Sequence, residues 1–185
     1  MSASGKARSR GGARTRASSR CLPPTSGDVV CDWIETFLVH GEGDWLGQPF
    51  RLTEDQRRLV YRIYERKPDG GRRYRQVLYG RAKGYGKTEL AAAIAIAELA
   101  GPIAPVAPDI PVAAASFEQA NLLFGTARTM ISDGPLRDYL EVYEREILRK
   151  DAPGRVYRVA AVAGTNDGGR HTFRVADEVH EWDGL

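Results

Sequence analysis

The sequence of 185 residues is poor in cysteine and has no long apolar run. Its two cysteines, Cys21 and Cys31, have a spacing that suits neither a metal site nor a disulfide framework, which indicates a reducing compartment. No apolar run approaches the ~18–20 residues that a membrane-spanning helix needs, so no membrane partner is expected. The first residues also lack the apolar core of a secretory signal. These absences predict a protein of the cytoplasm.

The first twenty residues contain no acid but carry six basic side chains. Because the net charge of the whole chain is +3, the remainder sums to 3 − 6 = −3, and its charge alone predicts no nucleic-acid surface. Residues 1–26 have too few large apolar groups to bury, which predicts a disordered tail. The tail could contact phosphates, or it could be a solvated segment that aids solubility. Residues 27–185 are expected to form one domain, since the chain's 42% hydrophobic and 28% charged residues are ordinary for a globular protein.

A glycine-containing loop lies between a short apolar run, residues 76–79, and an Ala-rich segment, residues 87–100. The run is predicted to be a strand and the Ala-rich segment a helix, which is the layout of a phosphate-binding loop. In such a loop, backbone N–H groups and the positive end of the helix dipole face a bound anion. The predicted contacts to ATP come from Arg81, Ala82, Lys83, Gly84, Tyr85, Gly86, Lys87 and Thr88.

Each residue type in this loop has a physical role. Gly84 and Gly86 let the backbone turn and approach phosphate without an intervening Cβ. Lys87 is expected to reach the outer phosphates, and the Thr88 hydroxyl is expected to hold Mg²⁺. The usual pattern has glycine where this chain has Arg81, so the loop is a variant. An ordinary turn at a helix start is the alternative interpretation.

The segment before the loop supplies a second candidate contact. A helix is predicted over residues 28–40, and Trp45 and Phe50 after it are interpreted as packing anchors. Thr53 and Gln56 have the spacing of a capping box at the start of the next helix. Gln56 could instead hydrogen-bond an adenine edge through its donor and its acceptor. The two roles compete for one side chain.

After the loop, the helix over residues 87–100 is apolar nearly all round, which predicts that it lies in the core. A short buried strand is expected over residues 111–115. Ser116 and Gln119 repeat the capping-box spacing and predict another helix as far as Ile131. A further helix is expected beyond Gly134 and Pro135. Its apolar side would be formed by Leu136, Leu140, Tyr143 and Ile147, and its solvated side by the pairs Glu141–Arg145 and Glu146–Lys150.

The last third of the chain contains two predicted strands, residues 156–162 and 172–176, with a turn signal at residues 166–168 between them. These strands could pair directly or simply share a sheet. The second strand ends in Asp177 and Glu178. There Asp177 would bind Mg²⁺, usually through water, and Glu178 would act as general base on the attacking water. A solvated strand end is the alternative interpretation of the two acids, and no zinc role is assigned to the nearby His180.

These residues together resemble the large subunit of tailed-bacteriophage terminase, over roughly residues 34–185. The matching pieces occur in the family's order. They are G-D-W-L-G-Q-P-F-R-L-T-E-D-Q, R-A-K-G-Y-G-K-T, A-A-A-S-F-E-Q-A, A-G-T-N-D-G and V-A-D-E-V-H-E-W. The first and the last are the most specific, because many ATPases share the rest.

The resemblance implies an ATP-hydrolysing motor of phage DNA packaging that uses ATP and Mg²⁺. It adds weight to the adenine role of Gln56, and it makes Arg81 a family variation of the loop, which could stabilise the γ-phosphate or bond a neighbouring subunit or loop. It implies an α/β fold of the P-loop NTPase type, with a mainly parallel central sheet and helices on both faces. The implied partners are double-stranded DNA, the terminase small subunit, the portal protein and further copies of the chain, in the cytoplasm of a bacterial host.

The sequence departs from the family in length, since it ends seven residues after Glu178. The expectation is an ATPase domain truncated at its C-terminal side, without the family's nuclease domain, and possibly inactive alone. Two other interpretations stay open. One is a fragment of a superfamily 2-type helicase, although helicases normally have small residues where this chain has Arg81, Ala82 and Lys83. The other is a catalytically silent remnant that acts as a binding module.

Overall fold

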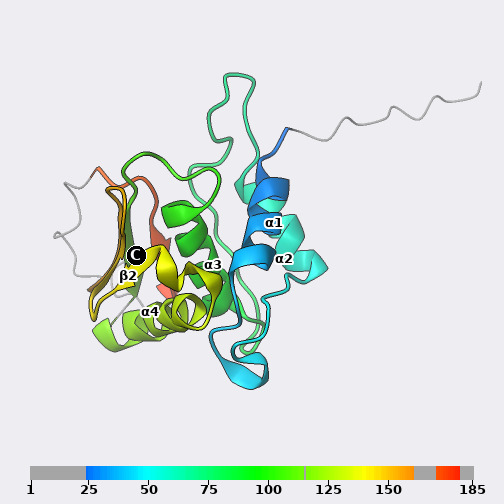
Figure 1. Ribbon diagram of the computed structural model, residues 1–185. Coiled ribbons are helices and arrows are strands. Elements are labelled where there is room, and N and C mark those ends of the chain that lie inside the picture. Colours follow the sequence, from blue (N-terminus) through cyan, green and yellow to red (C-terminus); the bar gives the residue numbers. More distant parts are fainter. Residues whose placement is uncertain (1–23, 115, 161–169, 180–185) are drawn as a thin grey trace, which may run out of the picture.

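The computed structural model describes residues 24–114, 116–160 and 170–179. These residues form an α/β fold in which a sheet and the helices lie in layers (Figure 1). The elements are α1 (Gly27–Phe37), η1 (Gly43–Trp45), α2 (Glu54–Ile63), α3 (Lys87–Ala100), β1 (Asp109–Ala114), α4 (Phe117–Ser132), η2 (Pro135–Asp138), β2 (Leu140–Val142), β3 (Glu146–Arg149), β4 (Arg155–Ala160) and β5 (Val175–Ala176). None of these helices is long and apolar enough to cross a membrane.

The sheet has five strands in the order β2-β3-β4-β1-β5. β1 pairs in parallel with both β4 and β5, whereas β2 pairs antiparallel with β3, and β3 with β4. The sheet is therefore mixed, and the prediction of a mainly parallel sheet is wrong. The two late strands do not pair with each other, because β1 lies between them: Val112 is opposite both Arg158 and Val175. Because β1, β4 and β5 are parallel, their carboxyl ends lie at the same end of the sheet.

The helices of the described residues lie on one side of the sheet, in two layers (Figure 1). α3 and α4 pack against the strands, and α1 and α2 form the outer layer, where α1 packs against α3. The expected arrangement with helices on both faces is not found in this part of the chain. The sequence between α4 and β4 folds into η2 and the strands β2 and β3 instead of the expected helix, so it adds to the sheet rather than covering it.

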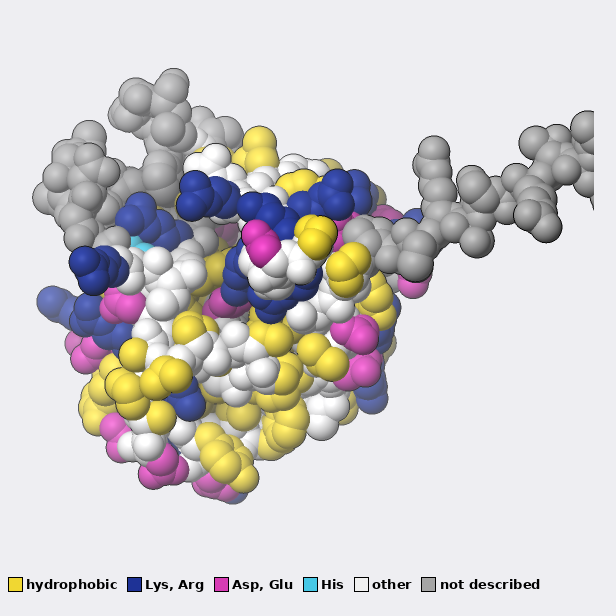
Figure 2. Space-filling model, turned by 90° about the horizontal axis from the view of Figure 1, so that it is seen from above, with side chains coloured by type: hydrophobic (Ala, Val, Ile, Leu, Met, Phe, Trp, Pro, Cys, Tyr) yellow, Lys and Arg dark blue, Asp and Glu magenta, His cyan; other side chains and the backbone are white. Residues whose placement is uncertain are grey.

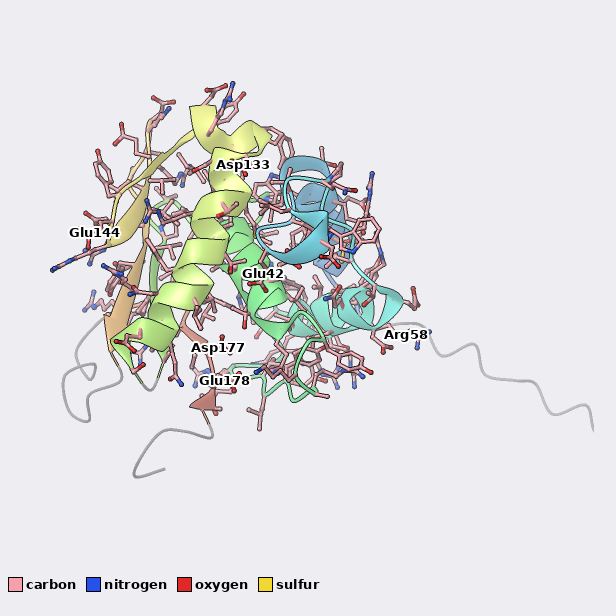
Figure 3. All side chains as sticks on the ribbon, turned by 90° about the horizontal axis from the view of Figure 1, so that it is seen from below. Glu42, Arg58, Asp133, Glu144, Asp177 and Glu178 are labelled. Atoms are coloured by element: carbon pink, nitrogen blue, oxygen red, sulfur yellow. The ribbon has the colours of Figure 1, made fainter. Side chains whose placement is uncertain are left out.

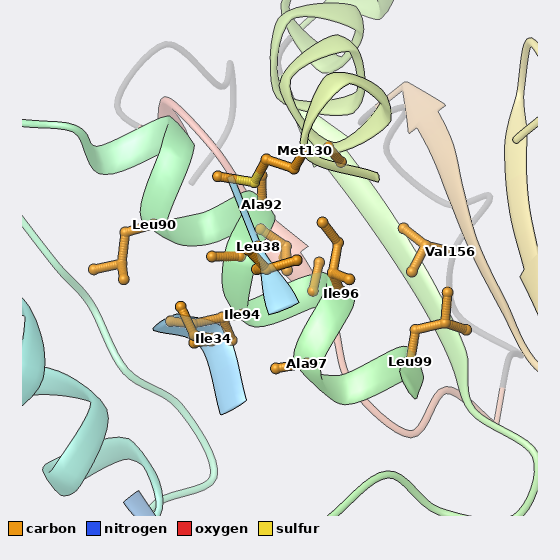
Figure 4. Packing of buried hydrophobic residues seen from close by; sticks show 14 of the residues in the cluster. Ile34, Leu38, Leu90, Ala92, Ile94, Ile96, Ala97, Leu99, Met130 and Val156 are labelled. Atoms are coloured by element: carbon orange, nitrogen blue, oxygen red, sulfur yellow. The ribbon is translucent and has the colours of Figure 1, made fainter. Parts of the chain in front are cut away.

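α3 is buried because it is the middle layer. Its side chains point to all sides, with Ile94 near Ile34 of α1, Ala92 near Met130 of α4, and Ile96 and Leu99 toward the sheet (Figure 4). Alanine dominates the helix because close approach to packed neighbours on every side leaves little room for larger groups. The prediction of a core helix over residues 87–100 is confirmed at both ends.

The prediction of a helix after Gly134 and Pro135 is wrong. A short 3₁₀ turn, η2, is followed by the hairpin of β2 and β3, in which Glu141 is opposite Leu148. The apolar spacing fits a helical period, but pairing of β3 with β4 gives the backbone hydrogen bonds of a sheet and buries Ile147 completely. Tertiary pairing thus overrides the local pattern. The helical pairs Glu141–Arg145 and Glu146–Lys150 do not form as such.

The strand predicted before the loop is also wrong: residues 76–79 have no strand structure. A strand needs a partner, and β5 is the edge of the sheet that the described residues form. Val77 and Leu78 remain 47% and 84% exposed, although their sequence suits a buried strand.

The predicted tail begins to be ordered before its expected end at residue 26. The Thr25 hydroxyl donates to the Tyr61 carbonyl at 2.7 Å, and Ser26 is the N-cap residue of α1. That helix ends at Phe37, three residues earlier than predicted. The rest of the tail, the turn at residues 166–168 and His180 lie outside the described residues.

Candidate nucleotide-binding site

The loop that precedes α3 has the backbone of an anion-binding turn. Gly84 has φ of 84° and Gly86, the N-cap residue of α3, has φ of 65° with ψ of 30°. Both lie in the left-handed region, which a side chain would disfavour. The first N–H groups of α3 and the positive end of its dipole therefore open onto this loop. This geometry explains why glycine occurs at these two positions.

Lys87 lies across the loop. Its Nζ donates to the carbonyl of Arg81 at 3.1 Å and, at 3.5 Å, to that of Ala82. The ammonium group is thus held within the loop, near the N–H groups of the helix start. Positive charge, helix dipole and free N–H groups in one place favour a phosphate ligand.

The Thr88 hydroxyl, in the first turn of α3, donates to Oδ2 of Asp177 at 3.1 Å. Asp177 follows β5 directly, and its own N–H continues the sheet by donating to the Ala113 carbonyl at 2.9 Å. The sheet edge and the helix start therefore bring together two residues that the chain separates by 89 positions. Figure 3 shows Asp177 and Glu178 side by side at the end of β5, next to the loop.

Glu178 has an unusual backbone for its residue type. Its φ is 47°, and its N–H donates to Oδ1 of Asp177 at 3.0 Å. A left-handed conformation costs a residue with a side chain about 1 kcal/mol or more, and such conformations cluster at functional sites. The chain therefore turns directly after Asp177, which stays bonded to Thr88.

A cavity of about 360 Å³ opens beside the loop. Gln56, 8% exposed, lines it from the first turn of α2. The capping box is confirmed: the Thr53 N–H donates to Oε1 of Gln56 at 2.9 Å. The amide Nε2 instead faces the loop, 3.4 Å from where a Cβ on Gly86 would lie. The capping role therefore uses only the acceptor of Gln56, and its donor lies beside the loop.

Arg81 is ion-paired at the mouth of this cavity. Its guanidinium donates to Oδ2 of Asp55 at 2.8 Å and lies over the Tyr79 ring. Hydrogen bonding to Tyr79, and then to Asp55, raises the pKa of Arg81 above its ordinary value. In this structure Arg81 therefore bonds another segment of the same chain, the first turn of α2. Its expected role at the γ-phosphate stays a prediction.

Several cavity residues, Trp45, Glu89 and His40 among them, were not recognised from the sequence as part of a site. Trp45 is not a packing anchor, since it is 62% exposed and lines the cavity, whereas Phe50 is buried as expected. Glu89 is buried, and its Oε1 accepts from the Gly41 N–H at 2.9 Å and contacts Nδ1 of His40 at 3.0 Å. An acid inside an otherwise apolar helix was the signal, because a buried carboxylate requires polar partners.

Comparison with known proteins agrees with this geometry. The crystal structure of the HK97 bacteriophage large terminase superposes with a TM-score of 0.70 at 26% sequence identity, over 83% of this chain and 31% of that one. The terminase large subunit of Enterobacteria phage HK97 is 35% identical over 111 residues. The chain is a homologue of phage terminase large subunits.

Two further relatives extend the similarity. The gene 13 protein of Mycobacterium phage L5 is 33% identical over 147 residues, and that of Mycobacterium phage D29 is 32% identical over 148 residues. Each match covers 72% of this terminase homologue but only 25% of the relative, and the HK97 protein is covered over 21%. The chain thus spans about a quarter of the length of these relatives. No family model matches it.

Proposed function

We propose that this terminase homologue is the nucleotide-binding part of an ATPase motor for phage DNA packaging. The observation that carries the proposal is the hydrogen bond between Thr88 and Asp177, which joins the phosphate-binding loop to the acidic strand end. Phosphoryl transfer needs both parts in one place, one for the phosphate charge and one for the nucleophile. The homology to terminase large subunits supports the same conclusion.

In this proposal the loop from Arg81 to Thr88 binds the phosphates of ATP, with Lys87 as the main charge partner. The donor set fits Mg²⁺, which prefers hard oxygen ligands and keeps part of its water shell. Because the Thr88 hydroxyl donates its hydrogen bond to Oδ2 of Asp177, the hydroxyl oxygen retains lone pairs for a cation, and the Asp177 carboxylate lies beside it. Mg²⁺ bound there would offset phosphate charge.

Glu178 is the proposed general base for the attacking water, and Arg81 a group that stabilises phosphate charge once it leaves Asp55. The amide of Gln56 is the proposed contact for the adenine edge, with exposed aromatic rings of Trp45 and Tyr85 lining the same cavity. Double-stranded DNA, a small terminase subunit, a portal protein and sister copies are the proposed partners, in the cytoplasm of a bacterial host.

Binding of a fluorescent ATP analogue in the presence of Mg²⁺ tests the proposal. The Lys87→Ala variant should lose most of the affinity, because it removes the ammonium group that lies against the loop carbonyls at the start of α3. Lys150→Ala is the matched control, since that lysine is exposed and bonds only the Arg137 carbonyl. Equal affinity of the two variants, or no binding by the unmodified chain, would favour a silent binding module. Unwinding of a duplex without packaging partners would favour a helicase.

A further inference from the structure

Positive charge is concentrated in one loop of the folded chain. Residues 62–75, here called the basic loop, contain six Lys or Arg and two acids, a net charge of 6 − 2 = +4. The chain beyond its first twenty residues sums to −3, so the part outside the basic loop sums to −3 − 4 = −7. A local excess of this sign on an acidic body is typical of a surface for a polyanion.

The basic loop has a defined backbone. It folds back on itself through an isolated bridge between Arg66 and Arg72, and the N–H of Arg73 donates to the Glu65 carbonyl at 2.9 Å. At its tip the Asp69 carboxylate accepts from the Gly71 N–H at 2.8 Å. It stands above the helices in Figure 1, and Figure 2 looks down on the cluster of Lys and Arg side chains around it.

One of the two acids in this loop, Glu65, is engaged with arginines. Glu65 is 2% exposed and pairs with Arg62 at 2.7 Å and with Arg73 at 3.5 Å. Among the described residues no acid forms an ion pair with Lys67 or Arg75, and both side chains are exposed. These two cations are therefore available to an outside partner.

The loop is also fixed to the far end of the helix that starts at the nucleotide site. Glu98, in the last turn of α3, is 1% exposed. Its carboxylate accepts from Arg72 of the loop at 2.8 Å and from the Tyr64 hydroxyl at 2.7 Å. α3 begins at Lys87, and at about 1.5 Å per residue the helix spans about 17 Å between Lys87 and Glu98.

We propose that the basic loop binds the phosphate backbone of double-stranded DNA, and that α3 links this surface to the nucleotide site. The identity of the partner rests on the proposed function. Arginine and lysine side chains on an ordered, projecting turn match the regular negative charge of a duplex, and binding gains free energy from counterion release. Because Glu98 holds Arg72, a shift of α3 on nucleotide binding would move the basic loop and the DNA bound to it.

The test uses the full chain and a labelled duplex of about 30 base pairs, titrated by fluorescence anisotropy between about 50 and 200 mM salt. The Lys67→Gln/Arg75→Gln variant should bind roughly tenfold or more weakly, and its slope of log affinity against log salt should fall by about 2, about one unit per lost contact. The six cations of the first twenty residues are present in every variant, so the difference reports on the loop alone.

Arg58→Gln/Arg128→Gln is the matched control, because it removes two exposed charges from α2 and α4. The charge-conserving Lys67→Arg/Arg75→Lys variant should bind like the unmodified chain. Binding of the ATP analogue should be the same in all four proteins. Equal affinities and salt slopes for the loop variant and the control would overturn the proposal, as would absence of duplex binding at 50 mM salt. Either result leaves the Lys87→Ala test of the nucleotide site unaffected.

Discussion

Glu178 combines two features: a left-handed backbone, and a place just after the strand β5, beside the loop that precedes α3. The strain of that backbone is offset by the sheet and by the bond of its N–H to the Asp177 carboxylate. Its side chain can be changed without touching that bond. An experiment can therefore change the Glu178 carboxylate while the Glu178 backbone keeps its conformation.

Glu178→Gln should leave binding of the ATP analogue unchanged and lower the rate of ATP hydrolysis by about 10²–10⁴-fold, the range typical of a lost general base. The amide keeps the size and the backbone but cannot take a proton from water. Phosphate release in the presence of duplex DNA is the measurement. Glu144→Gln, an exposed glutamate on the β2–β3 turn, is the control and should retain activity. A Glu178→Gln protein as active as this control would exclude the base role.

The first turn of α2 is the element that approaches the loop from the outer layer, through Gln56 and through the Asp55–Arg81 ion pair. Thr53→Ala removes the cap and should lower the free energy of unfolding by about 1 kcal/mol. It should also weaken ATP binding, because the Gln56 backbone N–H loses the hydroxyl that it bonds, and the first turn of α2, which carries the Gln56 amide, is then less firmly fixed. Urea unfolding and analogue titration measure the two effects.

Ser116→Ala provides the comparison for this element. It removes the equivalent cap of α4, where Ser116 and Gln119 bond reciprocally. The loss of stability should be similar, about 1 kcal/mol, with smaller effect on nucleotide affinity. If both variants changed affinity equally, the coupling of α2 to the loop would be unsupported.

β1 begins with an ionic cluster whose pH dependence can be predicted. Burial alone raises the pKa of Asp109, but hydrogen bonds and charge from Arg155 and His171 outweigh it and hold this pKa below its ordinary value. A lowered pKa in the folded state adds stability above the unfolded pKa of about 3.9, and this contribution is lost as pH falls through the folded value. Asp109→Asn should therefore be less stable at pH 7 and lose less stability below about pH 4.

Urea unfolding at several pH values measures this difference. Asp151→Asn, at an exposed position, should follow the pH profile of the unmodified chain. Parallel profiles for Asp109→Asn and the unmodified chain would mean that the Asp109 carboxylate gains nothing from its neighbours.

Elements with a clear local signal could be predicted from the sequence, including the strands β1, β4 and β5, whereas segments whose pattern fits more than one structure could not. The two capping boxes and α3 were found because Thr53, Ser116 and an apolar helix carry their own signals. β2 and β3 were missed because their apolar spacing also fits a helix, and only pairing with β4 decides between the two. Residues 76–79 were taken for a strand on composition alone, without a neighbour to pair with.

The candidate site divides in the same way. The loop glycines, Lys87 and the acidic pair were selected from residue type and order alone, and their roles stay predictions. Trp45 and Glu89 depend on which segments surround the loop, and that is a property of the packed layers. The Asp55 partner of Arg81 likewise comes from a helix about 25 residues earlier, which no local pattern connects to the loop.

At the scale of the whole molecule, the site joins two layers, because the hydrogen bond between Thr88 and Asp177 connects the start of α3 to the end of β5. A ligand that bridges them should stabilise the entire fold. At a concentration about 100 times its Kd, Mg²⁺-ATP adds about 2.7 kcal/mol, which for a chain of this size raises Tm by roughly 5–10 °C.

A thermal melt with ATP, with and without Mg²⁺, measures this shift. Removal of the metal with EDTA should abolish most of it, because the Thr88 and Asp177 oxygens would then face phosphate charge without a cation between them. Thr88→Val should lose the same part of the shift, since it keeps the side-chain shape but not the hydroxyl. Thr129→Val, whose hydroxyl bonds the Gly125 carbonyl within α4, should respond to Mg²⁺-ATP like the unmodified chain. A Tm rise that survives both EDTA and the Thr88 change would show that ATP binds without joining α3 to β5.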